Sequence, residues 1–203
     1  TWFGKEPAIN KILKFLPSFI LKTLVNSIFG LAVDDKGKFK FSENTKVQYN
    51  LSDMAQDAVS LMNELQIKKA HIIGASMGGM ITQLIALDHS DKVLSITPIM
   101  TSPGIQNDSL SGPTNGLLEA MKKSFVFNLK GKLEDGVVEI YRQLTGSRFP
   151  FNEADFREKL VPVMTHGNNP FAQHGAAVGA SADRTNRLSE IKVPTLIIHG
   201  TED

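Results

Sequence analysis

A serine flanked by glycines is the feature of this sequence most suited to chemistry. The segment Gly74-Ala75-Ser76-Met77-Gly78-Gly79 contains the pattern Gly-x-Ser-x-Gly, which in proteins places a nucleophilic serine on a sharp turn between a strand and a helix. We expect that positions 74 and 78 require glycine, because side chains there would collide across the turn. Ser76 is therefore the candidate nucleophile, and the turn pushes its Oγ outward.

The backbone N–H groups in the first turn of the helix after Ser76 could bind a negative charge. The first N–H groups of a helix have no partner within the helix, and they carry the positive end of its dipole. They would face the negative oxygen of a tetrahedral intermediate, so the backbone N–H of Met77 is the predicted first oxyanion donor. Two alternatives stay open, namely a glycine-rich turn with an ordinary serine and a phosphate-binding turn.

A serine hydroxyl needs a histidine base, and that histidine needs a carboxylate to orient it. Asp203 is the predicted orienting acid, because it follows an apolar strand at the sheet edge where open α/β folds place their sites. Glu202 is the local alternative, and a solvated turn is the third interpretation. No histidine is a convincing base in this pattern; the five are His71, His89, His166, His174 and His199.

Three short apolar runs predict the strands that position these residues. Runs of this length between turn signals are typical of strands, and parallel strands in α/β proteins are buried on both faces. We therefore expect three fully buried parallel strands, at Lys69–Ile73, Val93–Ile99 and Pro194–His199.

Helical spacing of apolar residues predicts a helix on either side of the first strand. The preceding helix has Ser52 or Asp53 as its N-cap and ends near Gln66, since these side chains favour that position. The following helix covers Met77–His89. The order is thus helix, strand, sharp turn, helix.

The first fifty residues predict helices and a loop outside this core. Ile9–Leu16 and Phe19–Ile28 have helical spacing and are separated by Pro17-Ser18, and Gly30 could end the second helix. We interpret them as two helices packed on a neighbouring core; the alternative is an apolar flap toward a membrane surface, a lipid substrate or a partner. Residues 34–50 predict a polar loop or a short edge hairpin.

Between residues 101 and 192, turns rich in Gly, Ser, Pro and Asn alternate with three helical patterns. We interpret this region as an inserted helical cap. Its phenylalanines either line an apolar substrate site or form the core of the cap itself; they are Phe125, Phe127, Phe149, Phe151 and Phe171. The predicted helices of the cap are Leu117–Phe125, Glu134–Leu144 and Glu153–Met164.

These patterns predict a division of the chain into three parts. Residues 1–101 form the N-terminal part of the core, and within them residues 1–46 form the apolar flap and linker. Residues 102–192 form the helical cap insertion. Residues 193–203 return to the core as a strand and its acid turn.

The composition excludes several classes of function. Twenty-two Lys and Arg against 21 Asp and Glu give a formal net charge of +1, without the broad basic field that nucleic-acid binding requires. The chain has no cysteine, which excludes disulfides, thiolate metal sites and a cysteine nucleophile. No transmembrane segment or secretory signal is legible, so we expect a cytoplasmic location. No feature specifies an oligomeric state.

With these residues in place, the chain resembles the serine branch of the α/β-hydrolase superfamily, and most of all bacterial esterases of the aclacinomycin methylesterase type. The resemblance covers roughly residues 47–102 and 176–203. It implies a mostly parallel sheet flanked by helices, with a helical cap. The stretches that carry it are Ser52–Ala55, Ala70–Met80, Ala180–Thr185 and Val193–Asp203.

The resemblance also implies the roles of particular residues. In the family, the serine on the sharp strand-to-helix turn, which is called the nucleophile elbow, is the nucleophile. The Asp that follows the strand ending in His-Gly completes a triad with a His on a later loop. These roles transfer to Ser76 and Asp203. The family has further strands before the point where this sequence begins, including a loop with the second oxyanion donor. We therefore expect an incomplete core, truncated at both ends, whose histidine is not present in this chain.

The expected function is hydrolysis of a small, hydrophobic carboxylic ester through an acyl-enzyme, with no cofactor and no metal. The elbow alone does not choose between this reaction and others of the same scaffold, which are those of peptidases, C–C bond hydrolases and cofactor-free haloperoxidases. A different class of function stays open as well. It is a non-catalytic binding protein that has kept the elbow.

Overall fold

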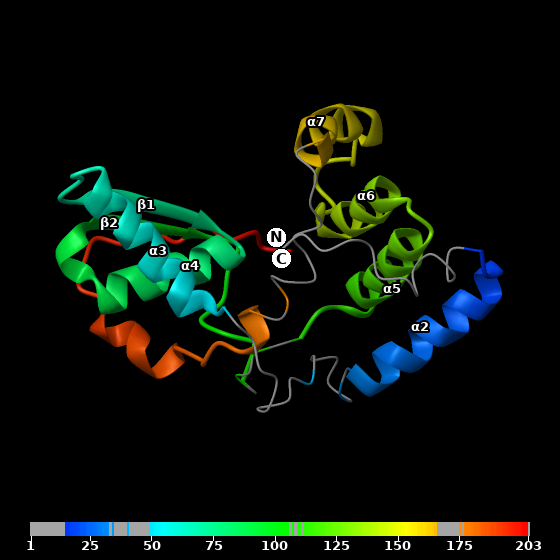
Figure 1. Ribbon diagram of the computed structural model, residues 1–203, viewed down its shortest axis with the longest axis horizontal. Helices are drawn as coiled ribbons and strands as arrows, with labels where there is room; N and C mark the ends of the chain where they lie inside the picture. Colours follow the sequence, from blue (N-terminus) through cyan, green and yellow to red (C-terminus); the bar gives the residue numbers. More distant parts are fainter. Residues whose placement is uncertain are drawn as a thin grey trace. The chain divides into compact units, whose positions relative to one another are not determined.

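The computed structural model describes residues 15–32, 34, 40, 49–105, 107, 109–110, 112–165, 175 and 177–202 (Figure 1). The chain divides into two compact units. The helical unit comprises Thr1–Lys40, Ser111–Asn169 and Glu202, and the sheet unit comprises Phe41–Leu110, Pro170–Thr201 and Asp203.

The sheet unit is built on two parallel strands, β1 (Ala70–Ala75) and β2 (Val93–Ile99). Their register pairs His71 with Ser95 and Ala75 with Ile99, after one irregularity next to Ala70. Both strands confirm the predicted apolar runs. Because they run in the same direction, Ser76 and the residues after β2 lie at the same edge of the sheet.

The third predicted strand lies beside β2 without becoming a regular strand. Single parallel bridges join Ile96 to Thr195 and Ile99 to Ile198. Four backbone hydrogen bonds of 2.9–3.2 Å support this pairing, two donated by Ile96 and Met100 and two accepted by the carbonyls of Ile96 and Pro98. The segment therefore brings the residues after Ile198 to the carboxyl edge of the sheet, as the sequence predicts.

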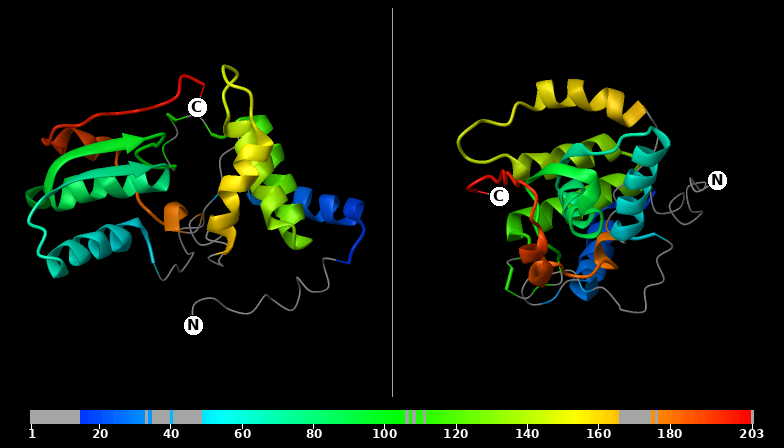
Figure 2. Two further views of the ribbon diagram at one scale, coloured as in Figure 1. Left: turned by 90° about the horizontal axis from the view of Figure 1, so that it is seen from above. Right: turned by 90° about the vertical axis from the view of Figure 1, so that its left-hand side faces the viewer.

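Two helices form the apolar core with the strands (Figure 2). α4 (Met77–Asp88) packs against both strands, and α3 (Leu51–Glu64) packs against α4. Two short 3₁₀ helices, η1 (Ser90–Lys92) and η2 (Thr185–Glu190), complete this unit. The fully or nearly buried residues of the core are Leu51, Ala55, Val59, Met80, Leu84, Ile85, Ala86, Val93 and Ile96.

The prediction that the strands are buried on both faces is wrong. Burial alternates along β1, where Ile73 is 69% exposed and its neighbours are half-buried. The other predicted strand segments also expose apolar side chains, among them Leu94 and Ile197. The physical reason is that α3 and α4 lie on one side of the strands, and no element in the described part of the chain covers the opposite face of β1.

The start of α3 differs from the prediction by two or three residues. The N-cap is Asn50, whose side chain accepts hydrogen bonds from the N–H groups of Ser52 (2.8 Å) and Asp53 (3.1 Å). Asp53 completes a capping box by accepting a hydrogen bond from the N–H of Asn50 at 2.8 Å. An Asn cap and an acidic third residue stabilise a helix start as well as Ser or Asp would, so the polar run permitted more than one cap.

The helical unit contains α2 (Ser18–Ala32), α5 (Asn115–Leu129), α6 (Leu133–Leu144) and α7 (Glu153–Thr165). The three later helices confirm the predicted helical patterns. α2 packs on α5 through the buried Leu21, Val25 and Leu129. It runs past Gly30, the predicted end, because a glycine is tolerated in a helix at a modest cost of about 1 kcal/mol.

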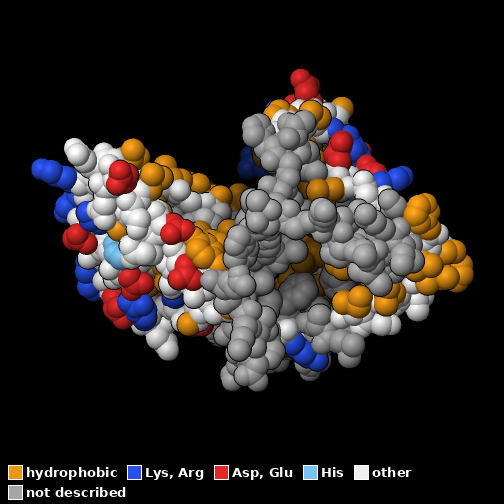
Figure 3. Space-filling model, in the orientation of Figure 1, with side chains coloured by type: hydrophobic (Ala, Val, Ile, Leu, Met, Phe, Trp, Pro, Cys, Tyr) orange, Lys and Arg blue, Asp and Glu red, His pale blue; other side chains and the backbone are white. Residues whose placement is uncertain are grey.

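Apolar residues also gather on the surface of α2 (Figure 3). Phe19 is 70% exposed, and Ile28 is exposed as well.

Phe151 packs in a second small core with Val137 and Leu160, so at this position the phenylalanine belongs to the core of the helical unit.

Several predictions lie outside the described residues. They are most of the first helix at 9–16, nearly all of the loop at 34–50, and the side chain of Phe171. Among the helices that the structure describes, none is long and apolar enough to span a lipid bilayer.

Candidate active site

Ser76 lies where β1 turns into α4, and its backbone is strained. Its φ is 53° and its ψ is −121°, a left-handed region that L-residues with side chains adopt at a cost of about 1–3 kcal/mol. Ser76 is exposed. Its Oγ has no hydrogen-bond partner within the described ranges, so the hydroxyl is open to a substrate.

Hydrogen bonds on both sides of Ser76 hold it in this conformation. Its N–H donates to the carbonyl of Ile99 at 2.9 Å, which continues the β1–β2 ladder by one residue. Its carbonyl accepts from the N–H of Gly79 at 2.9 Å and of Met80 at 3.3 Å. A third donor is the hydroxyl of Thr101, at 2.7 Å. Hydrogen bonds from β2, from Thr101 after it and from α4 thus fix the strained residue.

The expected collision across the turn is found at Gly74 and not at Gly78. A Cβ built on Gly74 would lie 2.1 Å from the carbonyl oxygen of Gly78 and 2.4 Å from the hydroxyl of Thr82. A Cβ on Gly78 would meet no described atom within 4 Å, so our reason for a glycine there is wrong. Gly79 is restricted instead, because its Cβ would lie 2.6 Å from the side chain of Thr101.

The start of α4 leaves backbone donors at the turn. The N–H groups of Gly79 and Met80 are occupied by the carbonyl of Ser76. Those of Met77 and Gly78 have no acceptor among the residues that the structure describes. Met77 is thus placed as the first helical residue beside the serine, where an oxyanion would need a donor.

Of the two candidate acids, the structure describes only Glu202. Asp203 lies outside the described residues, although the chain up to Thr201 follows the strand segment that reaches the carboxyl edge. Glu202, the alternative acid, accepts hydrogen bonds from the hydroxyl of Ser147 at 2.7 Å and from its N–H. These two hydrogen bonds, that of the hydroxyl first, lower the pKa of the Glu202 carboxyl.

The described histidines do not contact the nucleophile. His71 lies on β1, where its Nδ1 is 2.7 Å from the hydroxyl of Ser95. His89 lies at the far end of α4, and His199 lies at the end of the third strand segment. His166 and His174 lie outside the described residues. The structure therefore supplies no described histidine that is hydrogen-bonded to Ser76.

The sequence analysis does not predict a buried polar cluster that involves Arg184 and the helix α4. Arg184 is 3% exposed, and its Nε donates to the side chain of Gln83 on α4 at 3.3 Å. Its backbone N–H donates to the carbonyl of Pro103 at 3.0 Å, and the Gln83 amide donates to the carbonyl of Ser102 at 3.4 Å. Burial lowers the pKa of the Arg184 guanidinium. The cluster ties the loop after β2 to the elbow helix.

Ser181 connects the same late segment to α3. Its hydroxyl accepts a hydrogen bond from the N–H of Leu51 at 3.0 Å and donates to the carbonyl of Ala177 at 2.7 Å. The sequence signal for both Ser181 and Arg184 is the stretch Ala180–Thr185, which carries part of the family resemblance.

Among the described residues, no group of three or more His, Cys, Asp or Glu side chains could hold a metal ion.

Comparisons with known proteins give one family match and several relatives of this chain. A family model described as alpha/beta hydrolase fold matches residues 34–203. Rhodomycin D methylesterase DnrP of Streptomyces peucetius is 26% identical over 175 residues, covering 76% of this chain and 58% of that protein. The 3-oxoadipate enol-lactonase 1 of Acinetobacter baylyi is 24% identical over 167 residues, covering 82% of this chain and 58% of that protein.

A solved structure is similar as well. It comes from work on carboxylesterases of Nitrososphaera gargenis, and it aligns with a TM-score of 0.56 at 20% identity, covering 90% of this chain and 68% of that one. This likeness shows the fold. The chain spans somewhat more than half the length of the two curated relatives.

Proposed function

The chain belongs to the α/β-hydrolase fold family, and from that premise we propose that it hydrolyses carboxylic esters through an acyl-enzyme on Ser76. The observation that carries the proposal is the elbow, where an exposed serine with a φ of 53° lies between a strand and a helix. The first two N–H groups of that helix have no acceptor among the described residues. The names of two relatives, a methylesterase and an enol-lactonase, support esters and lactones as the substrate class.

The reaction needs a nucleophile, a base and a donor to the oxyanion. Ser76 Oγ attacks the ester carbonyl carbon while a histidine takes its proton, and the carbonyl oxygen becomes negative. The N–H of Met77 donates to that oxygen. The intermediate collapses, the alcohol leaves with the proton from the histidine, and the acyl group stays on Ser76. Water then attacks the acyl-enzyme by the same steps and releases the acid.

Asp203 would orient the histidine in this proposal. We also propose that the histidine is not one of those in this sequence, and the supporting observation is that none of the three described histidines is hydrogen-bonded to Ser76. We propose a small hydrophobic ester as the substrate, and we propose that residues 102–192 form the helical cap insertion. The supporting observation is that the described helices α5, α6 and α7 all come from this stretch.

The test is labelling of the 203-residue chain with a fluorophosphonate, followed by peptide mass spectrometry to locate the adduct. Free imidazole is added in one arm, because it can act as the base that the mechanism requires. The same arms are run with p-nitrophenyl butyrate. We expect imidazole to increase labelling at Ser76, and to increase ester hydrolysis beyond the rate that imidazole gives in the presence of the Ser76→Ala variant.

Two variants make the result specific. Ser76→Ala should abolish the imidazole-dependent labelling, and Ser60→Ala, an exposed serine of α3, should leave it unchanged. Labelling of Ser76 without imidazole would support the nucleophile but contradict an external histidine. No labelling at Ser76 in either arm would contradict the hydrolase proposal and favour a non-catalytic binding protein.

A further inference from the structure

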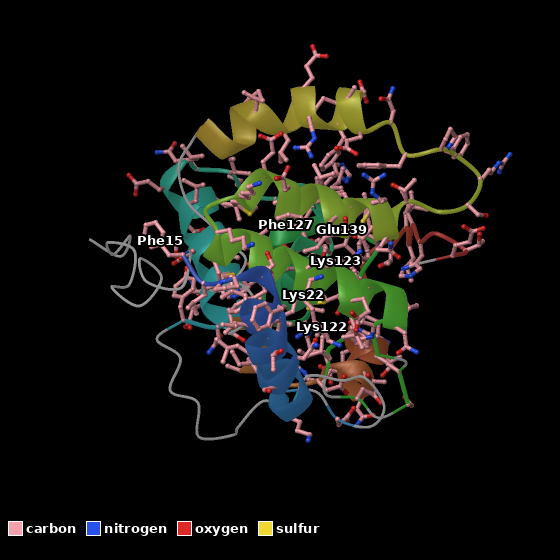
Figure 4. The ribbon with its side chains drawn as sticks, turned by 90° about the vertical axis from the view of Figure 1, so that its right-hand side faces the viewer. Phe15, Lys22, Lys122, Lys123, Phe127 and Glu139 are labelled. Carbon is pink, nitrogen blue, oxygen red and sulfur yellow. The ribbon has the colours of Figure 1, made fainter. Side chains whose placement is uncertain are left out.

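The helical unit contains a cavity of about 500 Å³ between α2 and α5, with one residue of α6 in its wall (Figure 4). This volume lies within the range of about 300–1,000 Å³ that is typical of small-molecule sites. All of its lining residues belong to the helical unit. The cavity is therefore separate from Ser76, which belongs to the sheet unit.

The wall of the cavity has an excess of positive charge. Four lysines line it, and two of them are paired with the glutamates of the wall: Lys122 with Glu119 at 2.5 Å and Lys123 with Glu139 at 2.7 Å. Lys130 donates a hydrogen bond to the hydroxyl of Ser18, which is neutral. Lys22 has no carboxylate partner among the described residues. Lys22 of α2 and Lys130, the residue that follows α5, are thus left without a carboxylate partner among the described residues.

The same cavity offers apolar surface next to these charges. Val25 of α2 is buried, and it lines the cavity together with Val126 and Phe127 of α5. Figure 4 shows that Lys22 comes from α2, whereas Phe127, Lys122 and Lys123 come from α5. An uncompensated cation beside an apolar wall fits a ligand with an anionic end and an apolar body, because each part then meets a complementary surface.

We propose that this cavity binds a small amphiphilic anion, with one carboxylate or phosphate group on an apolar chain. The anionic group lies between Lys22 and Lys130, and the chain lies against Val126 and Phe127. The proposal does not depend on Ser76, because its readout is binding and not turnover. Its failure is therefore distinguishable from a failure of the proposed hydrolase function.

The test is isothermal titration calorimetry of the full 203-residue chain with decanoate and, in a second arm, decyl phosphate. We expect one molecule bound per chain, and the preferred arm identifies the headgroup. Removing both uncompensated charges in the variant Lys22→Gln/Lys130→Gln should weaken binding about tenfold, as expected from two partly exposed ion pairs. The matched control Lys68→Gln/Lys69→Gln removes two exposed charges outside the cavity and should change nothing.

Further arms keep the proposal falsifiable without any variant. Decanol lacks the charge and inorganic phosphate lacks the chain, so both should bind more weakly than the amphiphiles. Added salt should weaken the binding of decanoate but not that of decanol, since salt screens charges. Equal binding of decanol and decanoate, equal losses in the two lysine variants, or no binding of either amphiphile would overturn the proposal.

Discussion

The two glycines of the elbow give a sharp test of its packing, because the structure assigns them opposite roles. In Gly74→Ala the new methyl group would lie 2.1 Å from the carbonyl oxygen of Gly78, more than 1 Å inside van der Waals contact. Two of the three nearest atoms are backbone atoms of Gly78, which cannot rotate away as the third, the side-chain hydroxyl of Thr82, could. Overpacking of this kind costs about 1–3 kcal/mol or more, and we expect the upper end of that range.

Gly78→Ala is the matched control. Its methyl group would meet no described atom within 4 Å, and an alanine inside a helix is about 0.5–1 kcal/mol more favourable than a glycine. For a chain of this size each kcal/mol shifts the midpoint of thermal unfolding by about 2–4 °C. Gly74→Ala should thus lower the midpoint by about 6–12 °C, whereas Gly78→Ala should keep or raise it.

The assay is thermal unfolding followed by circular dichroism, supported by urea unfolding of the same two variants. Equal losses of stability in both variants would refute the reasoning, since the close approach would then not be located at Gly74. An unchanged Gly74→Ala would refute it as well, because the elbow would have to be wide enough for a methyl group.

Three other predictions concern the groups that hold the elbow and the helical unit. Thr101→Val removes one of three donors to the elbow carbonyl and should destabilise the protein by about 1 kcal/mol in urea unfolding, whereas Thr101→Ser should not. Arg184→Met breaks a buried hydrogen-bonded cluster and should cost about 2 kcal/mol, against less than about 1 kcal/mol for the exposed Arg187→Met. Hydrogen bonds from two arginines lower the pKa of Glu153 below its ordinary 4.5, so its contribution to stability is present above that pH and is lost as the pH falls through the lowered value. Urea midpoints measured from pH 7 to pH 3 should therefore show a smaller acid loss in Glu153→Gln than in the wild type, and no such change in the exposed control Glu158→Gln.

The sequence predicts most elements of this fold because their signals are local. β2 lies where its apolar run predicts it, and the helix after Ser76 begins at Met77 as expected. Helical spacing and a strand-turn-helix motif depend on residues that are close together in the chain, so the sequence shows them directly. The N-cap of α3 was misplaced because Asn50, Ser52 and Asp53 are all good capping residues, and only the folded backbone selects one of them.

Features that depend on distant segments were not predictable in the same way. The exposure of Ile73 follows from which face the helices cover, and no local pattern states that. The link between Arg184 and Gln83 joins residues a hundred positions apart. The donor that Thr101 supplies to the carbonyl of Ser76 depends on the register between two strands. Such contacts become visible only when the chain has folded.

Backbone strain also distinguishes the candidate nucleophile from other unusual residues. Three non-glycine residues in the described part of the chain have positive φ: Gln66, Ser76 and Met100. Gln66 follows the end of α3, where a left-handed residue is an ordinary way to end a helix. Ser76 and Met100 instead stand at the carboxyl ends of two paired strands, where nothing in helix termination requires such a conformation.

Strain at that edge persists because hydrogen bonds over-determine it. Met100 donates to the carbonyl of Ile198 at 2.9 Å, and Ser76 is held through both its N–H and its carbonyl. Strained residues held in this way cluster at active sites. The combination of strain, exposure and free helical N–H groups is found at Ser76 and at neither of the other two, since Met100 precedes no helix and Gln66 follows one. This is why the elbow, and not positive φ alone, carries the proposed chemistry.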